Sequence, residues 1–212
     1  MSGPLLYYIT DRSQFPGDES ARRAELLVRV RAAAEAGVDY IQLRERDLSA
    51  RELESLAREA MRTIAGTSAR LLINHRADVA IAAGAAGVHL RSGPDELPVE
   101  EARAIFHKAG IDKSVIAVSC HTVSEVEAAA QGGADFVVFG PVFGKQDSDG
   151  SGVGKLRDAC AVAGIPVFAL GGIDLENAKE CLSAGATGVA GIRLFQEGAI
   201  GQTVAALNAL DS

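Results

Sequence analysis

Two arginines follow a short apolar run in the segment Gln42-Leu-Arg44-Glu45-Arg46. Alternate residues of an extended segment point to the same side, so Gln42, Arg44 and Arg46 would share one face. Two guanidinium groups on one face suit a phosphate or a carboxylate, because each can form two parallel hydrogen bonds to it. The pattern leaves a second interpretation open, in which Arg44 and Arg46 pair with Glu45 and Asp47 as a solvated rim.

A histidine stands where another apolar run stops, in the segment Val118-Ser-Cys-His121-Thr. On a strand, Ser119 and His121 would face one side and Cys120 the other. An imidazole, with a pKa near ~6.5, can both take and give a proton at neutral pH. A single histidine more often makes a structural hydrogen bond, so spacing alone leaves both roles for His121 open.

Glycines end the last two apolar runs, in Ala-Leu-Gly171-Gly172-Ile and in Val-Ala-Gly191-Ile192-Arg193. Glycine allows backbone N–H groups to approach an anion closely. These five residues are therefore predicted to bind a phosphate group. The alternative is that the first pair of glycines only forms a tight turn before a helix.

Eight short apolar runs recur along the chain and would position these residues. Each run is nearly continuous rather than alternating, which is typical of a strand covered on both faces. Segments with helical spacing separate the runs. A chain of 212 residues with this alternation predicts a single-domain (β/α)8 TIM barrel over residues 1–212. An open doubly wound sheet would leave two runs unexplained. The runs are Leu5–Thr10, Val38–Leu43, Arg70–Asn74, Gly87–Leu90, Ser114–Ser119, Asp135–Phe139, Pro166–Leu170 and Thr187–Ile192.

The active site of such a barrel is built from the loops that follow the strands. This rule adds Asn74 and Ser119 to the expected substrate-binding residues. His89 alternates with apolar neighbours and is expected to point into the barrel as a hydrogen-bonded core residue. His75 follows Asn74, and its position leaves a surface role and a ligand contact open.

Composition excludes several classes of partner. The net charge is −7 and the pI is near 5.1, which disfavours binding to nucleic acid or to an anionic membrane surface. No apolar run reaches the ~18 residues of a membrane span, and no basic region precedes the first run, so we expect a cytoplasmic protein. The three cysteines lack the spacing of a disulfide framework or a zinc site. The sequence leaves the oligomeric state, including a homodimer, open.

Six short segments that follow one another along the chain resemble, in their order and strand positions, the thiamine phosphate synthase and thiazole tautomerase (TenI) superfamily. The resemblance covers residues 5 to about 197. It implies a (β/α)8 barrel, a role in thiamine biosynthesis, and a thiazole phosphate bound on the backbone of Gly171–Gly172 and Ile192–Arg193. The segments are Gln42-x-Arg44, Asn74, Gly87-Val-His-Leu90, Val118-Ser-x-His121-Thr, Gly140-Pro-Val-Phe143 and Gly171-Gly-Ile173.

The chain departs from the synthases that it resembles in the metal-binding segments, in a phosphate clamp and at Arg46, where a lysine is expected but the charge is kept. Such synthases usually carry Asn-Asp after the third strand and Gly-Gln-Glu-Asp after the fourth, and the aspartates hold magnesium. Here the corresponding segments are Asn74-His75 and Leu90-Arg-Ser-Gly-Pro94, with Asp95 adjacent. A Pro-Thr-x-Thr-Lys phosphate clamp is replaced by Gly144-Lys-Gln-Asp-Ser-Asp-Gly150.

These departures predict the tautomerase branch. The reaction would be a metal-free proton shift that converts a thiazole carboxylate phosphate into its aromatic tautomer, with no cofactor. The resemblance implies that His121 shuttles the proton and that Gln42, Arg44 or Arg46 binds the carboxylate. The alternative is a magnesium-dependent synthase that couples hydroxymethylpyrimidine pyrophosphate to thiazole phosphate. A phosphate-ligand-binding protein without catalytic activity and a phosphosugar isomerase are further alternatives.

Overall fold

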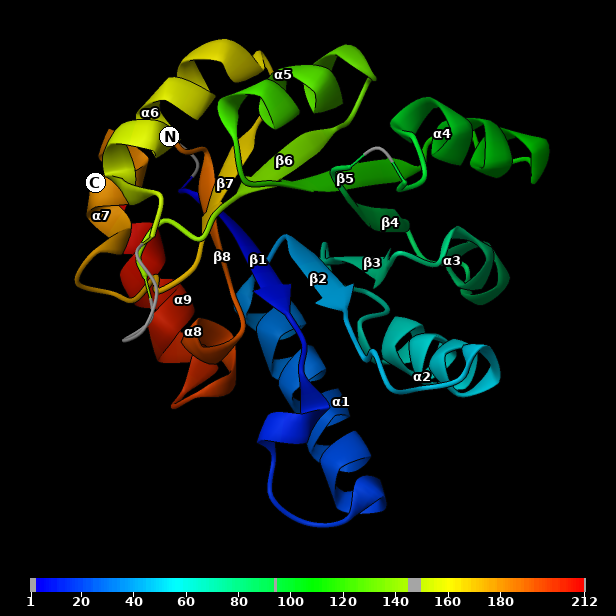
Figure 1. Cartoon of the computed structure of the whole chain (residues 1–212). Coiled ribbons are helices and arrows are strands. Elements are labelled where there is room, and N and C mark those ends of the chain that lie inside the picture. The colour runs from blue at the N-terminus through cyan, green and yellow to red at the C-terminus, as the bar shows by residue number, and fades with distance from the viewer. Residues whose placement is uncertain (1–2, 94, 145–149, 212) are drawn as a thin grey trace.

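Eight parallel strands close into a barrel in the computed structural model, which describes residues 3–93, 95–144 and 150–211. Each strand pairs with its sequence neighbours, and β1 pairs with β8 (Figure 1). The predicted (β/α)8 fold is therefore confirmed. The strands are β1 (Leu5–Ile9), β2 (Tyr40–Leu43), β3 (Arg70–Asn74), β4 (Gly87–Arg91), β5 (Val115–Cys120), β6 (Phe136–Phe139), β7 (Val167–Leu170) and β8 (Gly188–Gly191).

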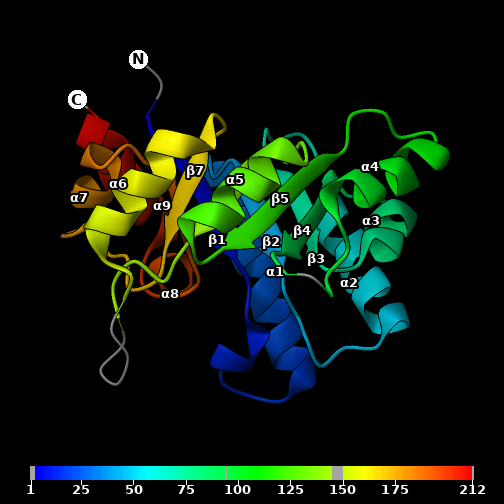
Figure 2. The ribbon, with the colours of Figure 1, turned by 45° about the horizontal axis from the view of Figure 1, so that its top comes forward.

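Helices connect the strands and surround the barrel, as Figure 2 shows. Oxygen-bearing side chains cap three of them: Asp18 accepts a hydrogen bond from the Ala21 N–H, and Ser49 and Thr122 each accept one in a complete capping box. The last strand is followed by two helices, α8 and α9, in place of one. The helices are α1 (Glu19–Ala36), α2 (Ala50–Thr63), α3 (Ala77–Ala83), α4 (Val99–Lys108), α5 (Val123–Gln131), α6 (Gly152–Ala163), α7 (Ala178–Ser183), α8 (Arg193–Gln196) and α9 (Ile200–Asn208), with 3-10 turns η1 (Arg12–Gln14) and η2 (Ala209–Asp211).

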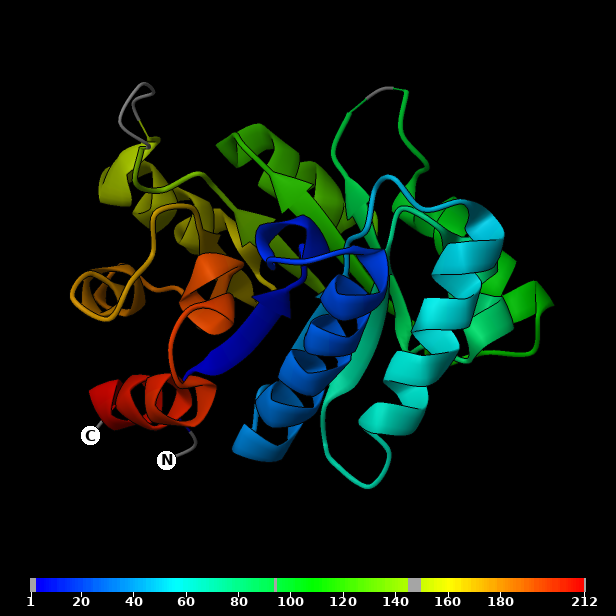
Figure 3. The same ribbon diagram turned by 90° about the horizontal axis from the view of Figure 1, so that it is seen from below.

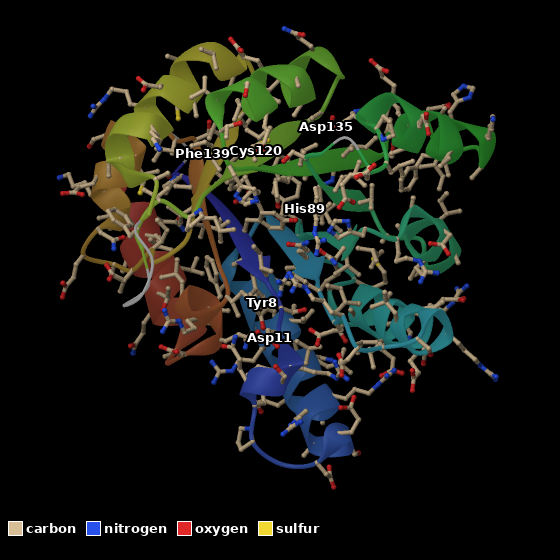
Figure 4. The ribbon with its side chains drawn as sticks, in the orientation of Figure 1. Tyr8, Asp11, His89, Cys120, Asp135 and Phe139 are labelled. Carbon is tan, nitrogen blue, oxygen red and sulfur yellow. The ribbon has the colours of Figure 1, made fainter. Side chains whose placement is uncertain are left out.

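Two apolar layers explain why the strand sequences are nearly continuous. Residues such as Tyr7, Phe136 and Phe168 fill the inside of the barrel. Their sequence neighbours face the helices, and Figure 4 shows Cys120 and Phe139 on that outer side. Because both faces of each strand are buried, a period of two in hydrophobicity is absent.

One end of the barrel carries the loops that follow the strands, and we call this end the mouth. In Figure 3 the described residues of the loop after β4 lie at the top, whereas the two ends of the chain lie at the bottom. Side chains at the carboxyl ends of the strands therefore gather at the mouth.

The cysteines behave as packing thiols in this fold. Cys120, Cys160 and Cys181 are all free, and Cys120 and Cys181 are buried. Burial raises the pKa of Cys120 to about 12, so its thiol stays protonated. None of the helices in the described ranges is both long and apolar enough to cross a membrane.

Candidate active site

The ion pairs of the segment after β2 show whether Glu45 and Asp47 pair with Arg44 and Arg46. Arg12, from η1, binds Glu45 through Nη1 at 3.0 Å and Asp47 through both terminal nitrogens at 2.7 and 2.8 Å. Glu45 is buried and also accepts a hydrogen bond from Thr10 Oγ1 at 2.6 Å. The carboxylates that could have neutralised the two arginines after β2 are therefore committed to Arg12, and the solvated-rim interpretation is wrong.

Three arginines are close enough at the mouth to affect one another. Arg44 is half-buried, and its pKa is lowered by burial and then by the nearby charges of Arg46 and Arg91. Neither Arg44 nor Arg46 forms an ion pair with a residue in the described ranges. Arg91 is 3.8 Å from Glu96, and the charges of Asp11 and Glu45 act on Arg44 without pairing with it. Guanidinium groups that lack a paired carboxylate favour an anionic ligand. Arg91 thus lies near Arg44 and Arg46, the two arginines that are predicted to bind an anion.

His75 lies beside this arginine group, at the end of β3. It has a φ of 59°, a left-handed conformation that is rare outside glycine. Burial lowers its pKa, and the charge of Arg91 lowers it further. Its Nδ1 is 3.6 Å from a carboxylate oxygen of Glu96, whose other oxygen is 3.8 Å from Arg91. His75 therefore belongs to the mouth rather than to the outer surface.

This part of the mouth does not fit a magnesium ion. Magnesium prefers an octahedral shell of oxygen ligands, usually including one or two carboxylates. The group near His75 offers Glu96 as a carboxylate, but Glu96 lies 3.8 Å from Arg91, and the charges of Arg91, Arg46 and Arg44 all act on His75 beside it. Within residues 3–93, 95–144 and 150–211, no three His, Cys, Asp or Glu side chains gather in a way that could hold a metal ion.

Gln42 and Asn74 meet as a pair between β2 and β3. The Gln42 amide donates to Asn74 Oδ1 at 2.8 Å, and Gln42 is buried. Asn74 is half-buried at the end of its strand. The structure thus brings together two residues that were predicted to bind substrate, and the buried Gln42 orients the more accessible Asn74.

His121 follows β5, and its ring is fixed by a neighbouring loop. Its Nδ1 lies 2.5 Å from the carbonyl oxygen of Gly140. A carbonyl oxygen can only accept, so Nδ1 carries the proton, and the neutral ring therefore has a free lone pair on Nε2. The backbone N–H of His121 donates to Glu125, in the capping box of α5. The ring is thus oriented as a proton acceptor through Nε2.

The glycine turn after β7 is joined to the loop after β6. Val142 N–H donates to the Leu170 carbonyl at 2.8 Å, and Phe143 N–H donates to the Gly171 carbonyl at 3.0 Å. Gly171 and Gly172 have φ values of 100° and 64°. A Cβ on Gly171 would lie 2.5 Å from the Cβ of Pro141. Both glycines are therefore required by conformation and by close approach.

Two of the predicted phosphate-binding residues, Gly172 and Arg193, line a common pocket. A pocket of about 330 Å³ is lined by Gly172, Ile173, Arg193 and Leu194, together with the carboxylates Asp174 and Glu197. Within the described residues, the backbone N–H groups of Gly172 and Ile173 have no hydrogen-bond acceptor. Free N–H groups beside a guanidinium are the groups that an anion requires.

A chain of contacts connects the histidine to this pocket. Gly140, whose carbonyl oxygen faces His121 Nδ1, precedes Pro141, and Pro141 is the residue that lies against Gly171. The ring of His121 and the glycine turn therefore share one supporting loop. The remaining predicted residues, Gly191 and Ile192, end β8 beside the same pocket.

An alanine at position 172 is expected to weaken phosphate binding by at least tenfold. Its Cβ would lie 2.8 Å from the Cβ of Phe143 at a φ of +64°, so the turn and the loop beside it must move. Calorimetric titration with inorganic phosphate and with thiazole phosphate measures the effect. Gly84→Ala is the matched control, because its φ is +70° but nothing lies within 4 Å of the new Cβ. Unchanged affinity in Gly172→Ala would contradict the assignment.

The strand-end rule selects Arg91 as a candidate at the mouth but gives it no binding role, and it does not select Arg12. Arg91 ends β4 with its strand neighbour Ser119 across the ladder, so its position on a strand end was the available signal. Arg12 carried no such signal, because its partners lie 33 and 35 residues away along the chain.

Comparisons with known proteins show which family the chain belongs to. The family model described as thiamine monophosphate synthase matches residues 6–195. A putative thiamine-phosphate synthase from Geobacter sulfurreducens is 44% identical over 87% of this chain and 83% of its own length. The thiamine-phosphate synthase of Clostridium novyi is 39% identical over 87% of this chain and 86% of its own length.

A solved structure gives the same result. The thiamine phosphate pyrophosphorylase from Pyrococcus furiosus superposes with a TM-score of 0.81 and 30% identity, covering 97% of this chain and 94% of that one. The names of these relatives are those of synthases, and none of them singles out the tautomerase branch. The chain belongs to the thiamine phosphate synthase and TenI family, a family of thiamine-biosynthesis enzymes.

Proposed function

We propose that this chain binds a thiazole carboxylate phosphate and shifts one proton on it to give the aromatic tautomer. The observation that carries the proposal is the geometry of His121, whose Nδ1 is bound to the Gly140 carbonyl oxygen so that Nε2 is free. The supporting loop also contacts the glycine turn, so a ligand with its phosphate on Gly172 would lie near the ring.

Each group of the ligand has a counterpart in the site. The phosphate binds the backbone of Gly171, Gly172, Ile192 and Arg193, where free N–H groups and a guanidinium are present. The carboxylate binds Arg44 or Arg46, whose charges no described carboxylate neutralises. His121 Nε2 takes the proton from one atom of the ring system and returns it to another. Proton transfer of this kind contributes roughly 10²- to 10⁴-fold to a rate.

Coupling of thiazole phosphate to a pyrimidine pyrophosphate is the second candidate. The names of the relatives favour it over the proton shift, since the proteins from Clostridium novyi and Pyrococcus furiosus are named for that activity. The arginine group also favours it, because Arg44, Arg46 and Arg91 offer positive charge to a departing pyrophosphate. Against it stands the misfit of magnesium near His75 described above.

A product assay separates the candidates. The purified chain is incubated with the unaromatised thiazole carboxylate phosphate and EDTA, and in parallel with thiazole phosphate, pyrimidine pyrophosphate and magnesium. We expect the aromatic tautomer to form faster than in buffer alone, without magnesium, and no coupled product to accumulate. The Clostridium novyi synthase serves as the positive control for coupling.

Each other outcome selects an alternative. Thiamine phosphate formed as the main product overturns the proton shift in favour of coupling. Tight binding of thiazole phosphate with neither product indicates a ligand-binding protein without catalytic activity. NMR detection of all substrates and products follows both reactions in one sample.

A further inference from the structure

A chain of three hydrogen-bonded side chains runs through the inside of the barrel toward the mouth. Tyr7 Oη is 2.7 Å from His89 Nδ1, and His89 Nε2 is 2.7 Å from Ser119 Oγ. Figure 4 shows His89 among the strands, inside the barrel. We infer that Tyr7 and His89 are positioning residues that fix the Ser119 hydroxyl as a hydrogen-bond donor to the ligand. This inference rests on the proposed function, because it assigns a contact within the same site.

Tyr7 determines the direction of the first hydrogen bond. Its ring is fully buried and packs edge-on against Phe136 and Phe168, with ring centroids 5.5 and 5.7 Å apart. Among the described residues, the Tyr7 hydroxyl has His89 as its hydrogen-bond partner. If His89 Nδ1 donated to it, the phenolic hydrogen would be buried in an apolar core without an acceptor, which is unfavourable. Tyr7 therefore donates, and Nδ1 accepts.

The direction of the Tyr7–His89 hydrogen bond fixes the direction of the His89–Ser119 hydrogen bond. His89 is neutral, because burial lowers its pKa to about 3. A neutral imidazole carries one N–H, and since Nδ1 accepts, the hydrogen is on Nε2. His89 Nε2 therefore donates to Ser119 Oγ, which uses one of the lone pairs of that oxygen. The hydrogen of the Ser119 hydroxyl is not used in this bond.

Ser119 presents that hydrogen at the mouth. It is partly exposed near the end of β5, where Arg91 is its neighbour across the β4–β5 ladder. Ser119 precedes His121 by two residues, so the two side chains lie on the same face of the extended chain. Its Oγ has no other hydrogen-bond partner within the described residues. An acceptor on the ligand, the nitrogen of the thiazole ring, is the partner that this donor fits.

The opposite arrangement has a different consequence. If Tyr7 did not donate, His89 Nε2 could accept from Ser119, and the serine would have no hydrogen for the ligand. Removing the Tyr7 hydroxyl should therefore weaken ligand binding although Tyr7 lies below His89 and does not reach the mouth. A purely structural role of Tyr7 does not predict this dependence on Ser119.

The tautomer of His89 is measured first, in protein without ligand. Nitrogen-15 NMR of histidine-labelled protein distinguishes protonated from unprotonated ring nitrogens, and His→Gln variants assign the four histidines. We expect an unprotonated Nδ1 in the wild type and in Ser119→Ala, and partial Nδ1 protonation in Tyr7→Phe. Tyr40→Phe is the control, because its ring packs in the same aromatic cluster, 4.8 Å from Phe136. A protonated Nδ1 in the wild type overturns the inference.

A double-mutant cycle then tests the link to the ligand, with thiazole phosphate as the probe in calorimetric titrations. Loss of one hydrogen bond in Ser119→Ala should weaken affinity about three- to tenfold. Tyr7→Phe should weaken it to a similar degree alone, and have no further effect in the Ser119→Ala background. An equal loss in both backgrounds overturns the inference.

The tautomer measurement and the binding measurement distinguish a failure of this inference from a failure of the proposed function. A wild type that does not bind thiazole phosphate overturns the proposed function, whereas the tautomer measurement needs no ligand and decides the direction of the chain by itself. If Tyr7→Phe unfolds, Ser119→Ala still reports on the tautomer, because Tyr7 remains present to donate.

Discussion

His121→Gln is expected to lower the turnover of the thiazole carboxylate phosphate by about 10²- to 10⁴-fold. Glutamine can still donate to the Gly140 carbonyl oxygen, so the loop keeps its support, but an amide does not take a proton near neutral pH. Affinity for thiazole phosphate should stay within about threefold, because the phosphate site is built from backbone groups and Arg193. Single-turnover kinetics and calorimetric titration measure the two quantities separately.

His107→Gln is the control for this variant. His107 lies in α4 with its side chain 76% exposed, and its ring is 3.6 Å from the equally exposed Asp112. Its replacement should change neither turnover nor affinity. Turnover of His121→Gln within threefold of wild type would show that another group moves the proton, and His75 at the mouth would then be the next residue to test.

Arg12→Met is expected to destabilise the fold by about 3–5 kcal/mol. The side chains of Arg12 and Glu45 are 4% and 1% exposed, so the change leaves a carboxylate buried without its counter-charge. Arg12 also binds Asp47, and this contact is the main cause that raises the Arg12 pKa. Urea unfolding followed by circular dichroism measures the loss in the free energy of unfolding.

Arg23→Met is the control that separates the effect of burying an ion pair from the effect of forming one. Arg23 binds Glu59 at 2.8 Å, but both side chains are partly exposed, at 26% and 34%. Exposed pairs contribute about 0–1 kcal/mol, so this control should lose little. A loss below about 1 kcal/mol in Arg12→Met would mean that the hydrogen bonds from Thr10 and from the backbone N–H of residue 12 suffice to hold the buried Glu45 carboxylate.

The same network supports the anion site. Thr10 donates to Glu45 and accepts from the backbone N–H of Arg44, so the cluster around Arg12 fixes the segment that carries Arg44. Arg12→Met should therefore also weaken binding of the ligand carboxylate, in addition to lowering stability. This network explains why the Glu45 carboxylate, which lies between Arg44 and Arg46 in the chain, forms its ion pair with Arg12.

The sequence was sufficient to predict the barrel and which of the candidate residues lie at the ends of its strands. Continuous apolar runs indicated strands buried on both sides, and the strand-end rule placed Arg44, His121 and Gly172 at the mouth. It also placed His89 inside the barrel, where the structure has it.

Side-chain pairing could not be predicted in this way. The choice of Glu45 between Arg44, Arg46 and Arg12 depends on how η1 folds over the barrel, which involves residues distant in the chain. The left-handed backbone of His75 carried no sequence signal either, because that conformation is usually marked by glycine or asparagine. The branch of the family was predicted from missing carboxylates, whereas the names of the relatives favour the synthase alternative.

The hydrogen bonds between the loops after β6 and β7 have a consequence for engineering. Val142 and Phe143 are bound to Leu170 and Gly171, and Pro141 rests on the glycine turn. The two loops thus form one transferable module. Chimeras that exchange substrate specificity with a relative should graft both segments together, since either one alone would meet a mismatched backbone partner.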